Sequence, residues 1–153
     1  MRFGFLVAEV YLELVGWNFK RTANCRPIPV NTFLIFIGGG LGAVSRWGLA
    51  TGIEKLTLKT AIHKFPLGIL ACNLLGCFLI GCVFGYFAQK HPAWVFPLLV
   101  TGFLGGFTTF STFGRDTFEA FNDGLPALAL ANILLSVLLS VAAVWAGLRL
   151  CSS

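Results

Sequence analysis

The sequence predicts an all-α membrane protein with four transmembrane helices, on three observations. Of its 153 residues, 57% are apolar and 11% are charged, whereas an average soluble domain has about 25% charged residues. The mean hydropathy is +0.85. The apolar residues fall into four runs of about 20 residues, the helix length that crosses the hydrocarbon core of a bilayer. These features exclude a soluble enzyme, a disordered chain and a disulfide scaffold, and barrel strands of about 10 alternating residues do not fit the runs.

The four helices are predicted at residues 32–51, 66–87, 94–121 and 126–149, so that residues 32–150 form one four-helix domain. Inside the apolar centres of these segments the only charged side chain is Arg46. A polar or charged group in a membrane span is costly unless it is paired or faces water. The few polar side chains of these segments are therefore the candidates for function.

Residues 1–31 are predicted to be a separate extension. Leu6, Val10 and Leu14 recur at helical spacing, with Glu9 and Glu13 on the opposite face. Two carboxylates in a short run argue against a spanning helix and favour an amphipathic helix in the membrane interface. A segment with two prolines follows, and we expect it to act as a stiff linker.

The net charge of +5 does not indicate nucleic-acid binding, because the basic residues lie in the gaps between apolar runs, where they act as interfacial anchors. They are nearly balanced between the two sides of the predicted bundle, so the positive-inside rule gives no orientation. A protein that inserts in both orientations would show such a balance. The five cysteines contain no C-x-x-C pair and are interpreted as small packing residues.

The third span, with the segment TGFLGGFTTFSTFG at residues 101–114, is the most informative. Adjacent glycines and adjacent threonines make a poor continuous helix, because glycine costs about 1 kcal/mol relative to alanine. We expect a break here, with freed carbonyls that a bound cation would satisfy. Phe110 and Phe113 lie three residues apart, and the positive ring edges of such a pair can contact an anion.

In the fourth span, Asn132, Ser136 and Ser140 are spaced four residues apart and form a polar stripe on one face. Such groups can donate hydrogen bonds to an anion, but they also commonly join helices to one another, and both interpretations stay open. Glycines recur at four-residue spacing in three spans, which permits close approach of helix backbones. Because four helices make a narrow bundle, a water-filled path is expected to need a second copy of the chain.

Three segments resemble the signatures of the Fluc (CrcB) fluoride channel family. They are GGLGAVSRW at residues 39–47, FPLG at 65–68 with NLLG at 73–76, and GFLGGFTTFSTF at 102–113. The third segment is the most specific, and the resemblance covers residues 32–150 in order. The extension lies outside it.

The resemblance implies an antiparallel, dual-topology homodimer in the cell membrane, with two pores through which fluoride leaves the cytoplasm passively. It implies no enzymatic activity. Arg46 would lie near a vestibule, and a structural Na⁺ at the dimer centre would be held by the backbone carbonyls of Gly105 and Thr108. The residues that would line the fluoride pore are Asn73, Phe110, Ser111, Thr112, Phe113, Ser136 and Ser140.

Several residues depart from the family pattern. Ile69 stands where threonine is usual, Trp47 replaces a frequent tyrosine, and Gly114 and Asp116 replace a common serine and glutamate. Arg115 adds an unexpected charge after the third motif. The core motifs are intact.

Two alternatives remain. A small multidrug-type exporter needs a carboxylate in its first span, and residues 32–51 contain none. A structural or assembly subunit of a membrane complex would conduct no ion, and only a flux measurement separates it from a channel. An intramembrane enzyme is disfavoured because both histidines lie in the gaps between spans.

Overall fold

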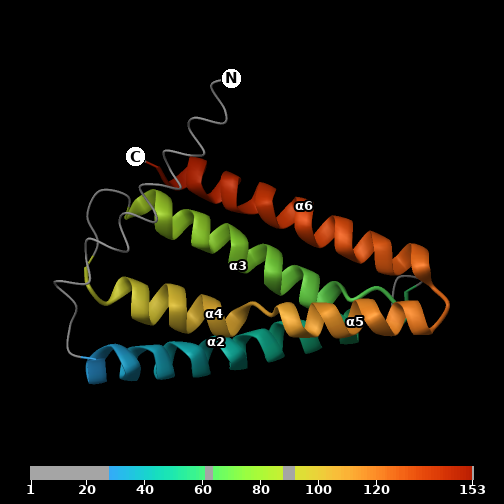
Figure 1. Cartoon of the computed structure of the whole chain (residues 1–153), viewed down its shortest axis with the longest axis horizontal. Helices are drawn as coiled ribbons and strands as arrows, with labels where there is room; N and C mark the ends of the chain where they lie inside the picture. The colour runs from blue at the N-terminus through green and yellow to red at the C-terminus, as the bar shows by residue number, and fades with distance from the viewer. Residues whose placement is uncertain (1–27, 61–63, 88–91, 153) are drawn as a thin grey trace.

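The computed structural model describes residues 28–60, 64–87 and 92–152. The predicted interfacial helix of the extension lies outside the described residues. Within them, four helical segments are long and apolar enough to span a membrane, as the sequence predicted: Val30–Thr57, Leu67–Tyr86, Phe96–Asn122 and Pro126–Cys151. Figure 1 shows them as an elongated bundle with α3 and α6 adjacent along one side and α2 below the third span.

The first and second spans are uninterrupted helices, α2 (Ile28–Thr57) and α3 (Leu67–Tyr86). α2 is longer at both ends than the predicted residues 32–51, and its first turn includes part of the expected linker. Proline is tolerated there because the first N–H groups of a helix have no partner within it. The fourth span is also one helix, α6 (Pro126–Cys151), which begins at a proline.

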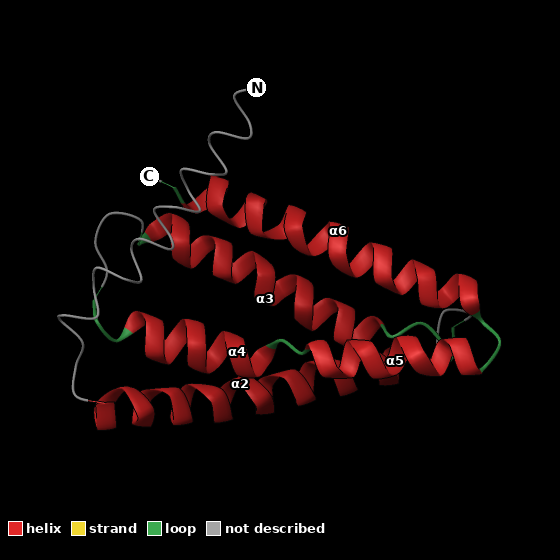
Figure 2. Cartoon of the chain, in the orientation of Figure 1, coloured by secondary structure: helices red, strands yellow, loops and turns green. Residues whose placement is uncertain are grey.

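The third span is bent, as Figure 2 shows by the loop between α4 and α5. It begins as a π-helix, η2 (Phe96–Leu104), continues in α4 (Gly105–Phe107), and resumes as α5 (Phe110–Asn122). Thr108 and Thr109 between them are extended, with ψ angles of 154° and 121°. The break therefore falls at the two threonines, while the adjacent glycines Gly105 and Gly106 stay helical.

The glycine pairs allow the helix backbones to touch, as predicted. A Cβ atom added at Gly42 would collide with the carbonyl oxygen of Phe103, and one at Gly106 with that of Gly39. On the other side of the bundle, Gly81 meets the Val144 carbonyl and Gly147 meets the Phe78 carbonyl. Two tight helix pairs result: α2 with η2 and α4, and α3 with α6.

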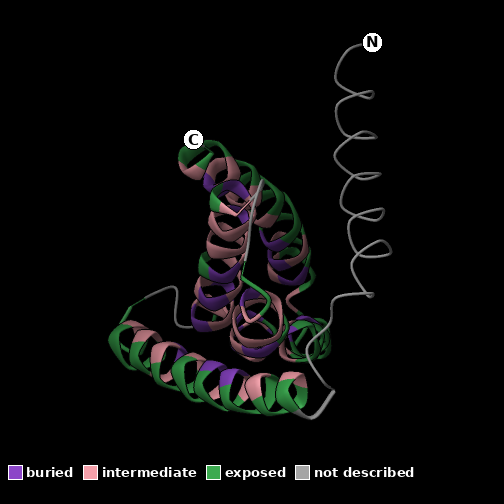
Figure 3. Cartoon of the chain, turned by 90° about the vertical axis from the view of Figure 1, so that its left-hand side faces the viewer, coloured by how far each residue is buried: buried purple, intermediate pink, exposed green. Residues whose placement is uncertain are grey.

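Buried residues lie where the helices face one another, and the outer surfaces are exposed (Figure 3). A central cluster is formed by Ala50, Cys72 and Phe107, from α2, α3 and α4. Ile69, which departs from the family pattern, packs against this cluster. Its apolar side chain therefore fills space in the core at the level of the break.

Candidate functional site at the break in the third span

Asn73 on α3 holds the break in place. Its Nδ2 donates to the carbonyl oxygen of Thr109 at 3.1 Å, and its Oδ1 accepts from the backbone N–H of Thr109 at 2.9 Å. One amide side chain thus satisfies both backbone groups of an extended residue. Because unpaired backbone groups are costly in a membrane, this pairing stabilises the interruption.

Thr109 is the N-cap of α5 and joins the hydroxyl groups that follow it. Its Oγ1 accepts from the backbone N–H of Thr112 at 3.2 Å, and lies 3.1 Å from Ser111 Oγ and 3.2 Å from Thr112 Oγ1. We call Thr109, Ser111 and Thr112 the hydroxyl cluster. It gathers two predicted pore residues next to the Asn73 amide. Thr109 is not among the predicted pore residues, although threonine at the start of a helix is a typical cap.

The same contacts leave two carbonyls without their helical donors. In a continuous helix the Gly105 carbonyl would accept from the N–H of Thr109, and the Thr108 carbonyl from that of Thr112. Both N–H groups instead donate to side chains, Asn73 Oδ1 and Thr109 Oγ1. The two carbonyls that the resemblance assigned to Na⁺ are thus among those that the break frees.

Arg46 of α2 reaches the break from the other side. Its Nη1 donates to the Thr108 carbonyl oxygen at 3.3 Å. The guanidinium therefore places a positive charge beside the interruption. A carbonyl oxygen has two lone pairs, so this contact leaves one acceptor position on Thr108.

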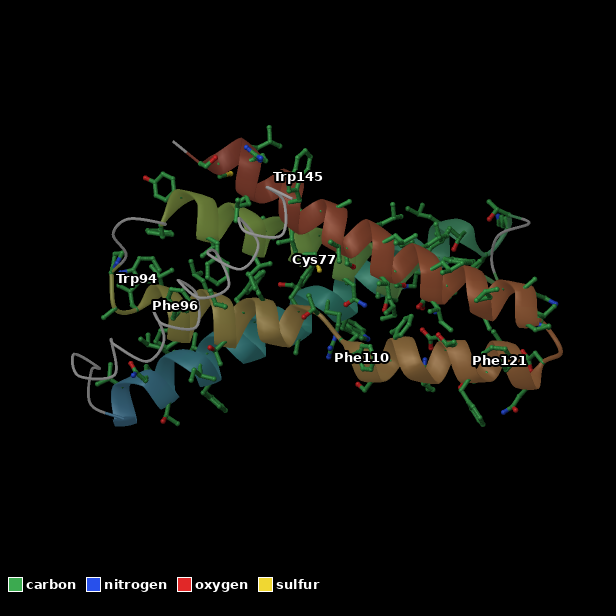
Figure 4. All side chains as sticks on the ribbon, turned by 45° about the horizontal axis from the view of Figure 1, so that its top comes forward. Cys77, Trp94, Phe96, Phe110, Phe121 and Trp145 are labelled. Atoms are coloured by element: carbon green, nitrogen blue, oxygen red, sulfur yellow. The ribbon has the colours of Figure 1, made fainter. Side chains whose placement is uncertain are left out.

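The phenylalanine pair lies at the start of α5. The ring centroids of Phe110 and Phe113 are 5.4 Å apart and the rings are tilted by 42°. Phe113 is half-buried, but Phe110 is 83% exposed, and Figure 4 shows it just past the break. One copy of the chain does not enclose this ring.

The polar stripe of α6 faces α5 and is largely buried. Asn132 Nδ2 donates to Thr117 Oγ1 at 2.9 Å, Ser136 Oγ contacts Asn132 Oδ1 at 3.4 Å, and Thr117 Oγ1 donates to the Phe113 carbonyl at 2.8 Å. Ser140 lies one turn further along and is half-buried. The stripe therefore joins two helices and ends at the backbone of Phe113. Thr117 was not predicted, because nothing in the sequence pairs it with Asn132.

We expect Thr117→Val to destabilise the α5–α6 pair by about 1–3 kcal/mol, because it leaves the buried Asn132 amide without its acceptor. Unfolding of the purified protein in detergent measures this loss. Thr101→Val, at an exposed threonine of the same span, is the matched control and should change stability little. Equal stability of the two variants would show that the Asn132 contact contributes nothing.

Comparison with known proteins identifies the family. The family model described as CrcB-like protein, Camphor Resistance (CrcB), matches residues 33–148. The chain is 42% identical over 118 residues to the "Fluoride-specific ion channel FluC" of a Nitratiruptor species, covering 77% of this chain and 89% of that protein. The chain belongs to the CrcB/FluC fluoride channel family. This confirms the resemblance drawn from the three motifs.

A second relative supports the same family membership. The protein of the same name from Paracoccus denitrificans is 43% identical over 119 residues, which cover 77% of this chain and 92% of the relative. Nearly the whole length of these relatives is thus matched by the four-helix region. Membership of a channel family also confirms the prediction that the chain is not an enzyme.

Proposed function

We propose that this CrcB/FluC chain is a fluoride-selective channel that lets fluoride leave the cytoplasm passively. The observation that carries the proposal is the break in the third span, where the Asn73 amide, the hydroxyl cluster and the Phe110–Phe113 pair meet within a membrane-spanning segment. The names of the relatives, fluoride-specific ion channels, support the choice of ion.

The chemistry of these groups suits fluoride. A small, strongly hydrated anion enters a pore only where fixed donors replace its water. Hydroxyl and amide groups supply such donors without a permanent charge, and the ring edges of Phe110 and Phe113 add a positive electrostatic surface that excludes bulk water. An inside-negative membrane potential then drives the anion outward, by about 2.3 kcal/mol per charge for each 100 mV.

We propose that two copies assemble antiparallel and complete the pores between them. The 83% exposure of Phe110 in a single copy supports this, because an ion-contacting ring needs a second wall. α2 also carries large exposed side chains beside the break, including Val44 and Trp47, at 68% and 70% exposure. The balance of basic residues between the two sides of the membrane is compatible with both orientations.

The freed carbonyls of Gly105 and Thr108 are proposed to hold a structural Na⁺. Neutral carbonyl oxygens are hard ligands suited to such a cation, and two copies would supply four of them. The described residues contain no group of three or more His, Cys, Asp or Glu side chains that could hold a metal. A bound Na⁺ would supply charge that draws the two breaks together, while Asn73 and Thr109 hold each break open.

Fluoride efflux from proteoliposomes tests the proposed function. Purified protein in vesicles loaded with potassium fluoride should release the ion when valinomycin compensates the charge, and a fluoride electrode records it. Chloride-loaded vesicles control for selectivity. Vesicles that keep their fluoride as protein-free vesicles do would overturn the proposal and favour an assembly subunit.

Removing sodium tests the proposed cation. Protein exchanged into N-methylglucamine buffer is expected to lose dimers, measured by crosslinking or single-molecule photobleaching, and returning Na⁺ should restore them. K⁺ and Li⁺ at equal ionic strength are the controls. A dimer fraction independent of the cation would contradict a structural Na⁺ and leave the fluoride experiment unaffected.

A further inference from the structure

Arg115 is a charged residue that the proposed pore does not use. It lies on α5, within the span Phe96–Asn122. Its Nη2 is 2.8 Å from Asp116 Oδ1, and its Nε is 3.6 Å from Glu119 Oε1. The side chains of Arg115 and Glu119 are 65% and 62% exposed, whereas that of Asp116 is 13% exposed.

These charges share a face of α5 with the hydroxyl cluster. Ser111, Arg115 and Glu119 are four residues apart and all exposed, so they form one stripe along the helix. The opposite face carries the buried Thr117 and Ala120. The stripe begins at Ser111, 3.1 Å from Thr109 Oγ1, and continues toward the end of the span.

A stripe of this kind does not suit lipid. The stripe starts inside the uncharged run that ends at Gly114 and continues past it, so its ionised side chains face water at the end of the span and not hydrocarbon. Arg115 lies four residues beyond Ser111, or about 6 Å along a helix axis. The stripe therefore fits the wall of an aqueous approach that leads an ion from the end of α5 to the hydroxyl cluster.

The sign of the charge along this approach affects the rate at which an anion enters it. Asp116 and Glu119 together contribute two negative formal charges beside Arg115. Arg115 bonds directly to the less exposed carboxylate, Asp116, through both Nε, at 3.2 Å, and Nη2. Without the Arg115 guanidinium, the charged side chains of this stretch of α5 would present only negative charge to an approaching anion.

We infer that the positive charge of Arg115 offsets the negative charges that line the anion approach, and so raises the rate of anion entry. The exposed carboxylate of Glu119 has the opposite effect and lowers that rate. The inference rests on the proposed fluoride function and adds a residue that sets the rate of entry to the pore. Neither residue belongs to the hydroxyl cluster or to the Phe110–Phe113 pair, so their expected effect on the ion is electrostatic and depends on ionic strength.

The experiment compares the wild type with three variants in proteoliposomes at about 10 mM and about 500 mM salt, where the Debye length falls from about 30 Å to below 8 Å. At low salt, Arg115→Gln should lower the fluoride efflux rate about threefold or more, and Glu119→Gln should raise it. The double variant should return toward the wild-type rate. High salt should bring all rates together.

Arg149→Gln is the matched control, because Arg149 is an exposed arginine at the end of α6, 5.7 Å from the Trp145 ring and outside the α5 stripe. It should leave the rate unchanged at both salt concentrations. Arg115→Lys, which keeps the charge, should retain most of the wild-type rate. If Arg115→Gln does not form dimers, the increase expected for Glu119→Gln decides the question.

Two results at low salt would overturn the inference, provided that the wild-type protein conducts fluoride. One is a Glu119→Gln efflux rate equal to that of the wild type, and the other is a wild-type efflux rate from Arg115→Gln dimers. A reduction that persists unchanged at high salt also overturns it, since it would indicate a packing role. Wild-type protein without fluoride flux would instead overturn the proposed function, and this inference with it.

Discussion

Asn73→Ala is expected to bring fluoride efflux down to the level of protein-free vesicles. The substitution removes both hydrogen bonds to Thr109 and leaves its N–H and carbonyl unpaired at the centre of the membrane. Each unsatisfied backbone group costs about 1–3 kcal/mol, so the two groups together destabilise the extended conformation by about 2–6 kcal/mol. The proposed pore donors and the phenylalanine pair then lose their arrangement. Electrode recordings of efflux, beside thermal unfolding in detergent, measure both effects.

Asn122→Ala is the matched control, since Asn122 is an exposed asparagine at the end of α5. It should conduct as the wild type does. Asn73→Asp separates the two bonds, because a carboxylate still accepts from the Thr109 N–H but cannot donate to its carbonyl. Full fluoride efflux through Asn73→Ala dimers would contradict the role assigned to the amide.

Gly42→Ala is expected to give the largest loss of stability among single-methyl changes in α2. The added Cβ would overlap the Phe103 carbonyl oxygen and lie 2.9 Å from the Phe107 backbone nitrogen, and backbone atoms cannot rotate away. α2 must therefore move from the third span, at a cost of about 1–3 kcal/mol. This loss should appear although alanine is the better helix former by about 1 kcal/mol.

Gly52→Ala in the same helix is the control, because no heavy atom lies within 4 Å of its added Cβ. It should be neutral or slightly stabilising. The two variants are compared by thermal unfolding and by the fraction of dimer in mild detergent. Equal unfolding temperatures would mean that α2 and the third span are less closely packed at Gly42 than the structure shows.

The four spans were predictable because a helix needs about 20 apolar residues to cross a bilayer, and such runs are visible in the hydropathy of the sequence. The place of the break was predictable only to within the segment at residues 101–114. The glycines weaken a helix locally, yet Gly106 is helical because it packs against Gly39, whereas Thr109 is extended because Asn73 binds both of its backbone groups. The contact that decides between them is 36 residues away in sequence.

For the candidate site too, the sequence predicted some features and the structure alone revealed others. The family motifs predicted Asn73, Phe110 and the hydroxyl residues as pore residues by position, which stays a prediction, and they did not predict the partners of these residues. The link from Asn132 to Thr117 depends on how α5 packs against α6, and the contact of Arg46 with the Thr108 carbonyl depends on where α2 lies. The π-helix at Phe96–Leu104 had no sequence signal, and nothing in its composition accounts for it.

Because the amide that fixes Thr109 comes from the same chain, the break in the third span needs no contact from a second copy to hold its shape. In the proposed dimer, assembly would bring together two breaks that have already formed. A hybrid dimer of one intact and one Asn73→Ala chain should consequently keep the break of the intact chain in its native shape. The substitution would then distort only the chain that carries it.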